Sequence, residues 1–388
     1  MNMKFINSIA LLAGFLVMSC SSQRNIPSGE DAVKLAARNY QAYMRDYPDP
    51  TKYLRSIDNG KLKATSSSDW TSGFFPGNLW YLYRLTRDER WKDAASKWTA
   101  GIEKEKDNKG THDLGFMMFN SIGLEYELTQ NLRQKEALIK GAKSLASRFD
   151  PKVGAIKSWD SKPWNYPVII DNMMNLEYLF WATKATGDSS YYKIAVQHAD
   201  TDMKYRFRAD NTTYHVLDFD AQTGKLLAKK THQGYADGSC WARGQAWAIY
   251  GYTVMYRETR QKKYLDQAVL ASSYFLSQTD KIADHIPYWD FNAPGIPDVP
   301  RDASAAAIAA SAFIEMNKYT GEKGYYLSKA KELLRSLTSQ KYLYHRSEYP
   351  YFLLDHSTGH HPKNSEIDVP IIYADYYLLE ALWRLKQK

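Results

Sequence analysis

The feature that most constrains the fold is a regular alternation of short and long connections between predicted helices. Apolar periodicity and helix stop signals predict twelve helices, at residues 30–46, 74–86, 91–105, 115–128, 133–148, 171–186, 190–205, 242–258, 262–277, 302–318, 322–338 and 370–386. The long connections are 47–73, 106–114, 149–170, 206–241, 278–301 and 339–369, and a short turn follows each second helix. In a run of antiparallel helices, this alternation places every short turn at one end of the molecule and every long loop at the other.

The short turns share a repeated sequence. An aromatic residue stands five positions after a threonine in Thr86 to Trp91 (TRDERW), Thr186 to Tyr191 (TGDSSY), Thr259 to Tyr264 (TRQKKY) and Thr320 to Tyr325 (TGEKGY), with Thr129 to Gln134 as a degenerate copy. Each copy predicts a helix end, a tight turn and a new helix whose aromatic packs back on its neighbour. Six helical hairpins that close on themselves, the last helix pairing with the first, give an all-α (α/α)6 barrel. An open solenoid is the structural alternative.

The chain shows no linker or low-complexity run that would divide it into several domains. Its 388 residues are 44% hydrophobic, enough for one large core. We therefore predict a single catalytic domain over residues 30–388. Within it, the alternating residues of 214–231 around Gly224 predict a small β-hairpin in one long loop.

The N-terminus resembles a bacterial lipoprotein signal. Lys4 precedes an apolar run that ends at Met18, and Ser19 then precedes Cys20. The pattern predicts a signal peptide at residues 1–19, lipidation of the Cys20 sulfur and a tether at 20–29. The apolar run is too short to span a membrane. No acidic run follows Cys20, so we expect a periplasmic or outer-membrane-associated lipoprotein. Cys240 would then be the sole remaining cysteine, a small buried residue without a disulfide.

Charge and histidine spacing bear on the partners. The formal net charge of +8 is spread along the chain and not gathered in a basic stripe, which favours a small acidic substrate over nucleic acid. His112, His215 and His232 lack the close paired spacing of metal ligands, and no cysteine cluster accompanies them. The sequence therefore predicts neither a nucleic-acid partner nor a metal site.

The unusual polar and aromatic motifs lie where the long loops lead into the even-numbered helices. They are DWTSGFFPG at 69–77, HDLGF at 112–116, NYPVIIDNMMN at 165–175, HQGYADGSCWARGQAW at 232–247, YWDFNAPGIPDVPRDAS at 288–304 and NSEIDVP at 364–370. In the predicted barrel they meet around one rim. Helix N-termini favour an anion, and aromatic rings suit the C–H faces of sugars. The rim is therefore predicted to process an anionic sugar.

Three aspartates stand at predicted helix starts, where Asp commonly caps a helix. Asp302 keeps that capping interpretation, because the alanine-rich segment after it indicates a tightly packed inner helix. Asp171 follows the apolar run 168–170, which would desolvate its carboxyl group and raise its pKa. Asp113 follows His112. A carboxylic acid with a raised pKa opposite an ionised carboxylate is the arrangement that general acid and base catalysis requires.

One arginine is predicted to hold the acidic group of the sugar. Arg243 lies one helical turn from Trp247 on the helix that begins near Trp241. A rim arginine can bind a carboxylate or a sulfate through two parallel hydrogen bonds. We therefore predict Arg243 as the anion clamp of the site.

Taken together, these motifs resemble glycoside hydrolase family 88, the unsaturated glucuronyl hydrolases. The resemblance rests on HDLGF, IIDNMMN, HQGYADGSCWARGQAW, YWDF followed by PRDASAAAIA, and NSEIDVPIIYADYYLLEAL, in the same order over nearly the whole mature chain. It implies an (α/α)6 barrel, no cofactor, and substrates made by polysaccharide lyases. Such substrates are oligosaccharides with a 4,5-unsaturated uronic acid at the non-reducing end.

The resemblance also implies roles for individual residues. Asp171 protonates C4 of the enol ether and helps to activate the water that adds at C5, after which the hemiketal collapses and the unsaturated sugar is released. Asp113 is the second essential carboxylate. The implied substrate-binding residues are Trp70, His112, His215, Thr231, Gln233, Arg243, Trp247 and Ser365. Members differ at the loop 362–365 in how they read sulfate on the next sugar. Fragments of heparin or heparan, chondroitin and hyaluronan and other lyase products are therefore all candidate substrates.

Three other functions compete with this interpretation. A related unsaturated rhamnogalacturonyl hydrolase would share the barrel and the chemistry but take pectin fragments. A non-catalytic glycan-binding lipoprotein would need the aromatic residues and Arg243 but not both Asp113 and Asp171. An ordinary glycosidase on the same barrel would act on saturated sugars.

Overall fold

The computed structural model of this chain describes residues 29–322 and 324–387. The predicted signal peptide, the lipid-bearing Cys20 and most of the predicted tether lie outside those residues. Within them, no helix combines the length and the apolar character needed to cross a membrane. The described residues correspond to the predicted catalytic domain.

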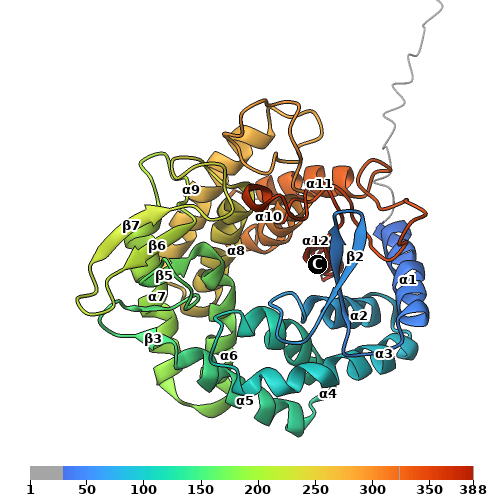
Figure 1. Ribbon diagram of the computed structural model, residues 1–388, viewed down its shortest axis with the longest axis horizontal. Coiled ribbons are helices and arrows are strands. Elements are labelled where there is room, and N and C mark those ends of the chain that lie inside the picture. Colours follow the sequence, from blue (N-terminus) through green and yellow to red (C-terminus); the bar gives the residue numbers. More distant parts are fainter. Residues whose placement is uncertain (1–28, 323, 388) are drawn as a thin grey trace, which may run out of the picture.

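The described residues form a ring of twelve α-helices, with one set around the axis and a second set outside it (Figure 1). The inner set is α2 (Phe74–Thr86), α4 (Leu124–Thr129), α6 (Leu176–Thr186), α8 (Ala242–Thr259), α10 (Ala303–Met316) and α12 (Ile372–Lys386). The outer set is α1 (Gly29–Asp46), α3 (Glu89–Thr99), α5 (Leu132–Ala146), α7 (Ser189–Arg206), α9 (Lys262–Thr279) and α11 (Tyr325–Leu337). The inner helices are the more deeply buried, and α10 has no exposed residue.

The ring closes where α12 packs between α10 and α2. The hydroxyl of Tyr40 in α1 also donates a hydrogen bond to Asp375 in α12 at 3.0 Å, which joins the first outer helix to the last inner helix. The predicted closed (α/α)6 barrel is confirmed, and the open solenoid is excluded.

The repeated threonines end the inner helices through a shared hydrogen-bond pattern. Each hydroxyl donates to the carbonyl four residues earlier at 2.7 Å and accepts the N–H two residues later, at Thr86, Thr129, Thr186 and Thr259. The residue after each threonine has a positive φ, which reverses the chain. The copy at Thr320 is wrong in detail. There α10 ends earlier, at Met316, and Tyr326 packs into the core while Tyr325 is exposed.

Two inner helices begin with irregular turns at the loop end. The predicted helix 115–128 starts as a π-helix, Gly115–Gly123, before α4, and the predicted helix 171–186 starts as a 3-10 helix, Ile170–Asn175, before α6. Elsewhere, α3 continues into a 3-10 helix, Ala100–Asp107, and a short 3-10 turn, His361–Lys363, lies in the last long loop. Irregular helical turns are frequent at functional sites. The π-helix begins two residues after Asp113, and the 3-10 helix before α6 contains Asp171.

Small antiparallel sheets decorate the long loops. The pairs are β1 (Tyr53–Asp58) with β2 (Lys61–Thr65), and β3 (Phe149–Asp150) with β4 (Ala155–Ile156). The predicted hairpin at 214–231 is confirmed as β6 (Val216–Phe219) and β7 (Leu226–Lys230). A third strand that we did not predict, β5 (Tyr166–Ile169), pairs with β6 so that Ile169 faces Val216. This register places His215 beside the segment that carries Asp171.

Candidate active site

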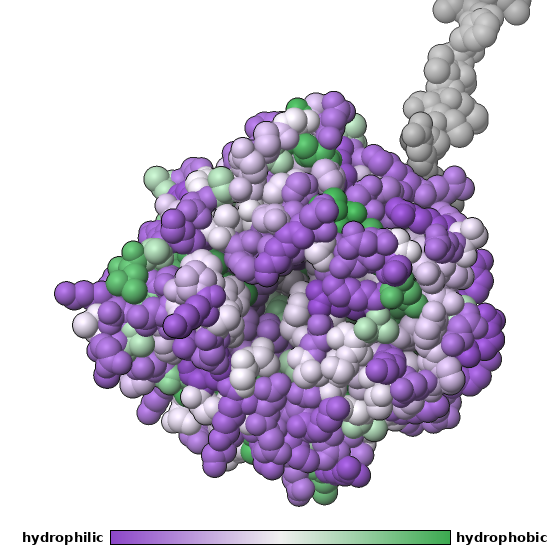
Figure 2. Space-filling view, viewed as in Figure 1, coloured by the Kyte–Doolittle hydropathy of each residue, from purple (hydrophilic) through white to green (hydrophobic). Residues whose placement is uncertain are grey.

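A pocket of about 350 Å³ opens among the long loops. Figure 2 shows a largely hydrophilic face that is hollowed near its centre, between the β1–β2 hairpin and the β5–β6–β7 sheet. The pocket is lined by Arg55, Trp70, His112, Asp113, Trp159, Ile169, Asp171, His215, His232, Gln233, Gly359, His360, Lys363, Ser365, Glu366 and Tyr373. These residues come from the long loops and the starts of inner helices, and five of the six predicted motifs contribute to the lining. The motif at 288–304 contributes no lining residue.

A glycine brings the two aspartate-bearing segments together. A Cβ on Gly115 would lie 2.4 Å from Oδ1 of Asn175, so only glycine allows the π-helix to approach the 3-10 helix this closely. The same Oδ1 atom accepts the N–H of Phe116 at 3.2 Å. Asp113 stands two residues before Gly115, and Asp171 four residues before Asn175. Neither helix start has a side-chain cap, so neither aspartate caps its helix.

His215 is held in one tautomer next to Asp171. Its Nδ1 accepts the backbone N–H groups of His232 at 3.1 Å and Gln233 at 3.0 Å. Because Nδ1 is an acceptor, the ring proton of neutral His215 is on Nε2. Nε2 faces Oδ2 of Asp171 at 3.6 Å, and neither atom has a hydrogen-bond partner among the described residues. Both residues line the pocket, and the hydrogen-bonding capacity of these two enclosed atoms is not used by the protein.

Asp113 has a comparable arrangement on the opposite segment. Its Oδ2 accepts the hydroxyl of Thr111 at 2.8 Å, and its Oδ1 lies 3.3 Å from Nε2 of His112. The carboxyl group keeps 17% of its surface exposed, whereas the His112 ring is buried. Asp113 thus presents one edge to the pocket.

Burial shifts the proton equilibria of the whole site. Desolvation raises the pKa of Asp171 to about 6, although the positive charge of the nearby Arg243 opposes the shift. Desolvation also raises the pKa of Asp113 to about 7. The pKa of His112 falls to about 4, and that of His215 falls well below its usual range, so both rings are neutral near pH 7. The predicted rise in the pKa of Asp171 agrees with this environment of apolar side chains.

The comparisons with known proteins agree with this geometry. Residues 38–287 match the sequence model of Glycosyl Hydrolase Family 88. The chain belongs to this family. An unsaturated glucuronyl hydrolase from Formosa agariphila is 50% identical over 321 residues, which are 82% of this chain and 80% of the relative. This family 88 chain is therefore a glycoside hydrolase.

Two crystal structures of family 88 proteins are also similar to the chain. An unsaturated glucuronyl hydrolase specific for heparin is 42% identical, with a TM-score of 0.89 over 94% of this chain and 98% of its own. A mutant unsaturated glucuronyl hydrolase from a Streptococcus agalactiae, complexed with dGlcA-GalNAc6S, is 31% identical, with a TM-score of 0.79 over 92% and 90% of the two chains.

Most of the predicted site residues line the pocket of this family 88 enzyme, namely Trp70, His112, Asp113, Asp171, His215, Gln233 and Ser365. Three of the predicted residues, Thr231, Arg243 and Trp247, do not line the pocket. Thr231 lies beside the pocket, where its hydroxyl accepts the N–H of Gly234. Trp247 is fully buried under the pocket floor, between Phe116 and Tyr377.

The prediction of Arg243 as a rim clamp is wrong in its placement. Its side chain is 1% exposed and packs over the ring of Trp241. One Nη donates to Asp302 at 2.7 Å and to the carbonyl of Thr358 at 2.6 Å, and the other donates to the carbonyl of Gly359 at 2.7 Å. Arg243 therefore fixes the pocket wall from behind, and its charge still acts on Asp171. The capping interpretation of Asp302 is confirmed, because its Oδ1 accepts the N–H of Ser304.

Several pocket residues were missed by the sequence prediction. Arg55 bridges the first and last long loops through Glu366 at 2.7 Å and Asp69 at 2.6 Å, and no local motif marked it. Trp159, His232 and His360 form an aromatic wall. The ring centroids of Trp159 and His232 are 5.4 Å apart, and those of His232 and His360 are 4.8 Å apart. A tryptophan in a long loop, such as Trp159, is a possible signal of a binding site, but the residue type alone does not show whether the side chain lines a pocket or packs in the core.

Proposed function

We propose that this enzyme hydrates the 4,5 double bond of an unsaturated uronic acid at the non-reducing end of lyase-generated glycosaminoglycan oligosaccharides and so detaches this residue, now without its double bond, from the rest of the oligosaccharide. The observation that best supports this proposal is the environment of Asp171. It combines a pKa raised to about 6, a carboxyl oxygen without a hydrogen-bond partner among the described residues, and a place in the same pocket as a second carboxyl group, that of the partly buried Asp113. The names of the relatives support the same reaction.

Asp171 begins the reaction as a general acid. Its carboxyl proton is transferred to C4, and the electron pair of the double bond forms the new C4–H bond. The positive charge that develops at C5 is shared with the ring oxygen. The substrate's own carboxylate adds negative charge to the pocket, which raises the pKa of Asp171 further and favours its acid form.

The same residue completes the addition as a base. A water molecule attacks C5 and gives its proton to the Asp171 carboxylate, which restores the acid. The product is a hemiketal at C5. It opens by cleavage of the bond between C5 and the ring oxygen, giving a ketone at C5 and a hemiacetal at C1, and the hemiacetal expels the rest of the oligosaccharide. Because water never attacks the anomeric carbon, the spacing rules for retaining and inverting glycosidases do not apply.

Asp113 and His215 support these proton transfers. His215 is neutral, and its Nε2–H points toward Asp171, so it orients the carboxyl group without neutralising it. Asp113 faces the bound sugar ring and accepts its hydroxyl groups. Between about pH 6 and 7 the two carboxyl groups together hold roughly one proton, which in the free enzyme lies mainly on Asp113 because its pKa is the higher of the two. Asp171 becomes the acid when the carboxylate of the bound substrate raises its pKa.

The pocket wall provides contacts for the sugar and for its substituents. The ring of Trp70 packs against the rings of Phe74, Phe116 and Tyr373. Lys363 lines the pocket and makes no ion pair with the described residues, whereas Arg55 is held by two carboxylates. Lys363 is therefore the cation that would meet a sulfate or carboxylate group, which favours an acidic glycosaminoglycan fragment over a neutral one.

The reaction is tested by incubating the enzyme with a panel of unsaturated disaccharides from heparin, chondroitin and hyaluronan lyases. The ultraviolet absorbance of the conjugated double bond should disappear as the saturated sugar is released. Release of that sugar with the absorbance retained would indicate an ordinary glycosidase. No change with any member of the panel, but binding of the disaccharides, would indicate a glycan-binding protein, and turnover of pectin-derived fragments alone would indicate a rhamnogalacturonyl hydrolase.

We also propose that the mature enzyme is tethered by lipid on Cys20 and faces the periplasm. The support is the sequence around Cys20, a short apolar run that ends in a small residue before the cysteine. Metabolic labelling with a palmitate analogue should mark the wild-type protein, and Cys20→Ala should remove the label and release the enzyme into the soluble fraction. An unlabelled wild-type protein would refute the tether.

A further inference from the structure

A second and larger cavity lies inside the ring at the end of the short turns. Its volume is about 570 Å³, within the roughly 300–1,000 Å³ of small-molecule sites. All six inner helices or their irregular first turns contribute to its wall, and it shares no lining residue with the substrate pocket. The rings of Phe74, Phe116 and Trp247 pack together with Tyr377 behind its wall, so an aromatic layer separates the two spaces.

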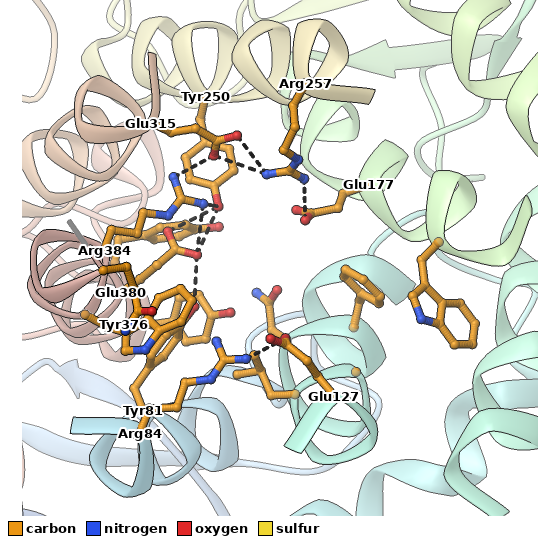
Figure 3. Close-up of a pocket in the computed structure, with 18 of the residues that line it drawn as sticks. Tyr81, Arg84, Glu127, Glu177, Tyr250, Arg257, Glu315, Tyr376, Glu380 and Arg384 are labelled. Carbon is orange, nitrogen blue, oxygen red and sulfur yellow. Dashed lines mark hydrogen bonds and ion pairs between the residues drawn. The ribbon is translucent and has the colours of Figure 1, made fainter. Parts of the chain in front are cut away.

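The charged groups of this cavity form a network of ion pairs (Figure 3). Arg84 pairs with Glu127 at 2.5 Å, and Arg257 pairs with Glu177 and with Glu315. Arg384 pairs with Glu315 at 2.9 Å and with Glu380 at 3.4 Å. With Lys318 included, the cations that line the cavity equal the carboxylates in number. The cavity therefore attracts neither anions nor cations strongly.

Two tyrosine hydroxyls in this wall have no protein partner. Tyr376 is 4% exposed and Tyr377 is 2% exposed, yet neither hydroxyl makes a hydrogen bond with any described residue, although both residues line the cavity. The neighbouring hydroxyls of Tyr81 and Tyr250 are different, because both donate to Glu380 at 3.0 Å. The rings are buried, but neither hydroxyl oxygen is among the enclosed polar atoms that lack a partner, so both reach the open space of the cavity, where a polar ligand can bind them.

Aromatic rings complete the wall on the side of α4 and α6. Phe119 stacks on Tyr178 with ring centroids 5.3 Å apart, and both Phe119 and Trp181 line the cavity while partly buried. Aromatic faces bind the C–H faces of sugars, while arginine–carboxylate pairs supply fixed donors and acceptors for hydroxyl groups. We propose that this cavity is a second carbohydrate site, which binds a neutral saccharide independently of the hydration pocket. The inference goes beyond the proposed reaction and does not depend on it.

The test uses saturation-transfer difference NMR with methyl β-glucoside and methyl β-N-acetylglucosaminide as probes. The enzyme carries Asp171→Asn and is first saturated with an unsaturated disaccharide, so that the hydration pocket is filled. Saturation transfer to at least one neutral probe should persist. Loss of the signal when the hydration pocket is filled, no signal from either probe, or stronger binding of glucuronate than of the neutral probes would each overturn the proposal.

A pair of tyrosine variants locates the site. Tyr376→Phe with Tyr377→Phe removes two hydroxyls that make no protein hydrogen bond, so the fold and the hydration rate should be unchanged. Binding of the probe should weaken about tenfold, as expected when one or two neutral hydrogen bonds are lost. Tyr83→Phe, which removes an exposed hydroxyl outside the cavity, is the matched control and should leave binding unchanged. Equal affinity in the double variant and the wild type would refute the assignment of this cavity.

Discussion

Asp171→Asn should stabilise the folded enzyme at alkaline pH while abolishing turnover. Burial raises the pKa of Asp171 from its ordinary 3.8 to about 6, which means that the folded state disfavours the charged form. A shift of about 2 units corresponds to about 3 kcal/mol, since each unit is about 1.36 kcal/mol. Asparagine has nearly the same shape and no charge, and Oδ2 of Asp171 has no hydrogen bond to lose.

The sign of the effect follows from proton linkage. The folded-state pKa is above the unfolded value, so the contribution of Asp171 is fully present below about pH 4 and is lost as the pH rises through about 6. At pH 8 the wild type should therefore be less stable than the variant by up to about 3 kcal/mol, and at pH 3.5 the two should be equal. For a chain of this length, that difference corresponds to roughly 4 °C in Tm.

Thermal unfolding of both proteins across pH 3.5 to 8 measures this difference. Asp302→Asn is the matched control, because Asp302 also stands at an inner-helix start but binds the buried Arg243 at 2.7 Å. Removal of its charge leaves Arg243 without a counter-ion and should destabilise the fold by about 3–5 kcal/mol. A gain for Asp171→Asn that does not change with pH, or a loss at pH 8, would refute the reasoning from desolvation.

Three further predictions concern catalysis and substrate recognition. The pH profile of kcat/KM should be bell-shaped, falling below about pH 6 as both carboxyl groups become protonated and above about pH 7 as the acid is lost; a flat profile from pH 5 to 9 would contradict the carboxyl mechanism. Arg243→Lys should raise KM several-fold and lower Tm, because lysine cannot bind Asp302 and the carbonyls of Thr358 and Gly359 at the same time. Unchanged kinetics would show that the pocket wall does not depend on these hydrogen bonds. Lys363→Ala should weaken binding of sulfated disaccharides more than that of unsulfated ones, measured as KM at low salt, and equal losses would exclude a role in reading sulfate.

The ring could be predicted from the sequence because its signals are local. Each short turn is encoded by a threonine that bonds within its own helix and by a residue with positive φ directly after it, so the turns are visible without knowledge of the fold. Strict alternation with long loops then fixes which ends of the helices meet. The copy at Thr320 misled the prediction because α10 ends one turn earlier and Tyr326, not Tyr325, packs into the core.

The pocket was predicted where residue type and local context agree. Asp171 follows an apolar run, so the adjacent sequence already indicates that its carboxyl group is desolvated. Arg55 carries no such signal, since its partner Glu366 is 311 residues away. The unpredicted strand β5 is a similar case, because its four residues read as a buried apolar run until β6 is present to pair with them.

Arg243 shows why a correct local interpretation was not sufficient. Asp302 was interpreted as a helix cap, and its Oδ1 does cap α10, but a carboxylate has a second oxygen, and Oδ2 binds Arg243. The arginine then uses its remaining donors on the carbonyls of Thr358 and Gly359, and the last long loop is fixed against α8 and α10. One buried ion pair therefore positions the loop that carries Lys363. For this reason, we expect substitutions at residue 363 to change which substituent the pocket accepts, while substitutions at 243 or 302 change whether the pocket forms.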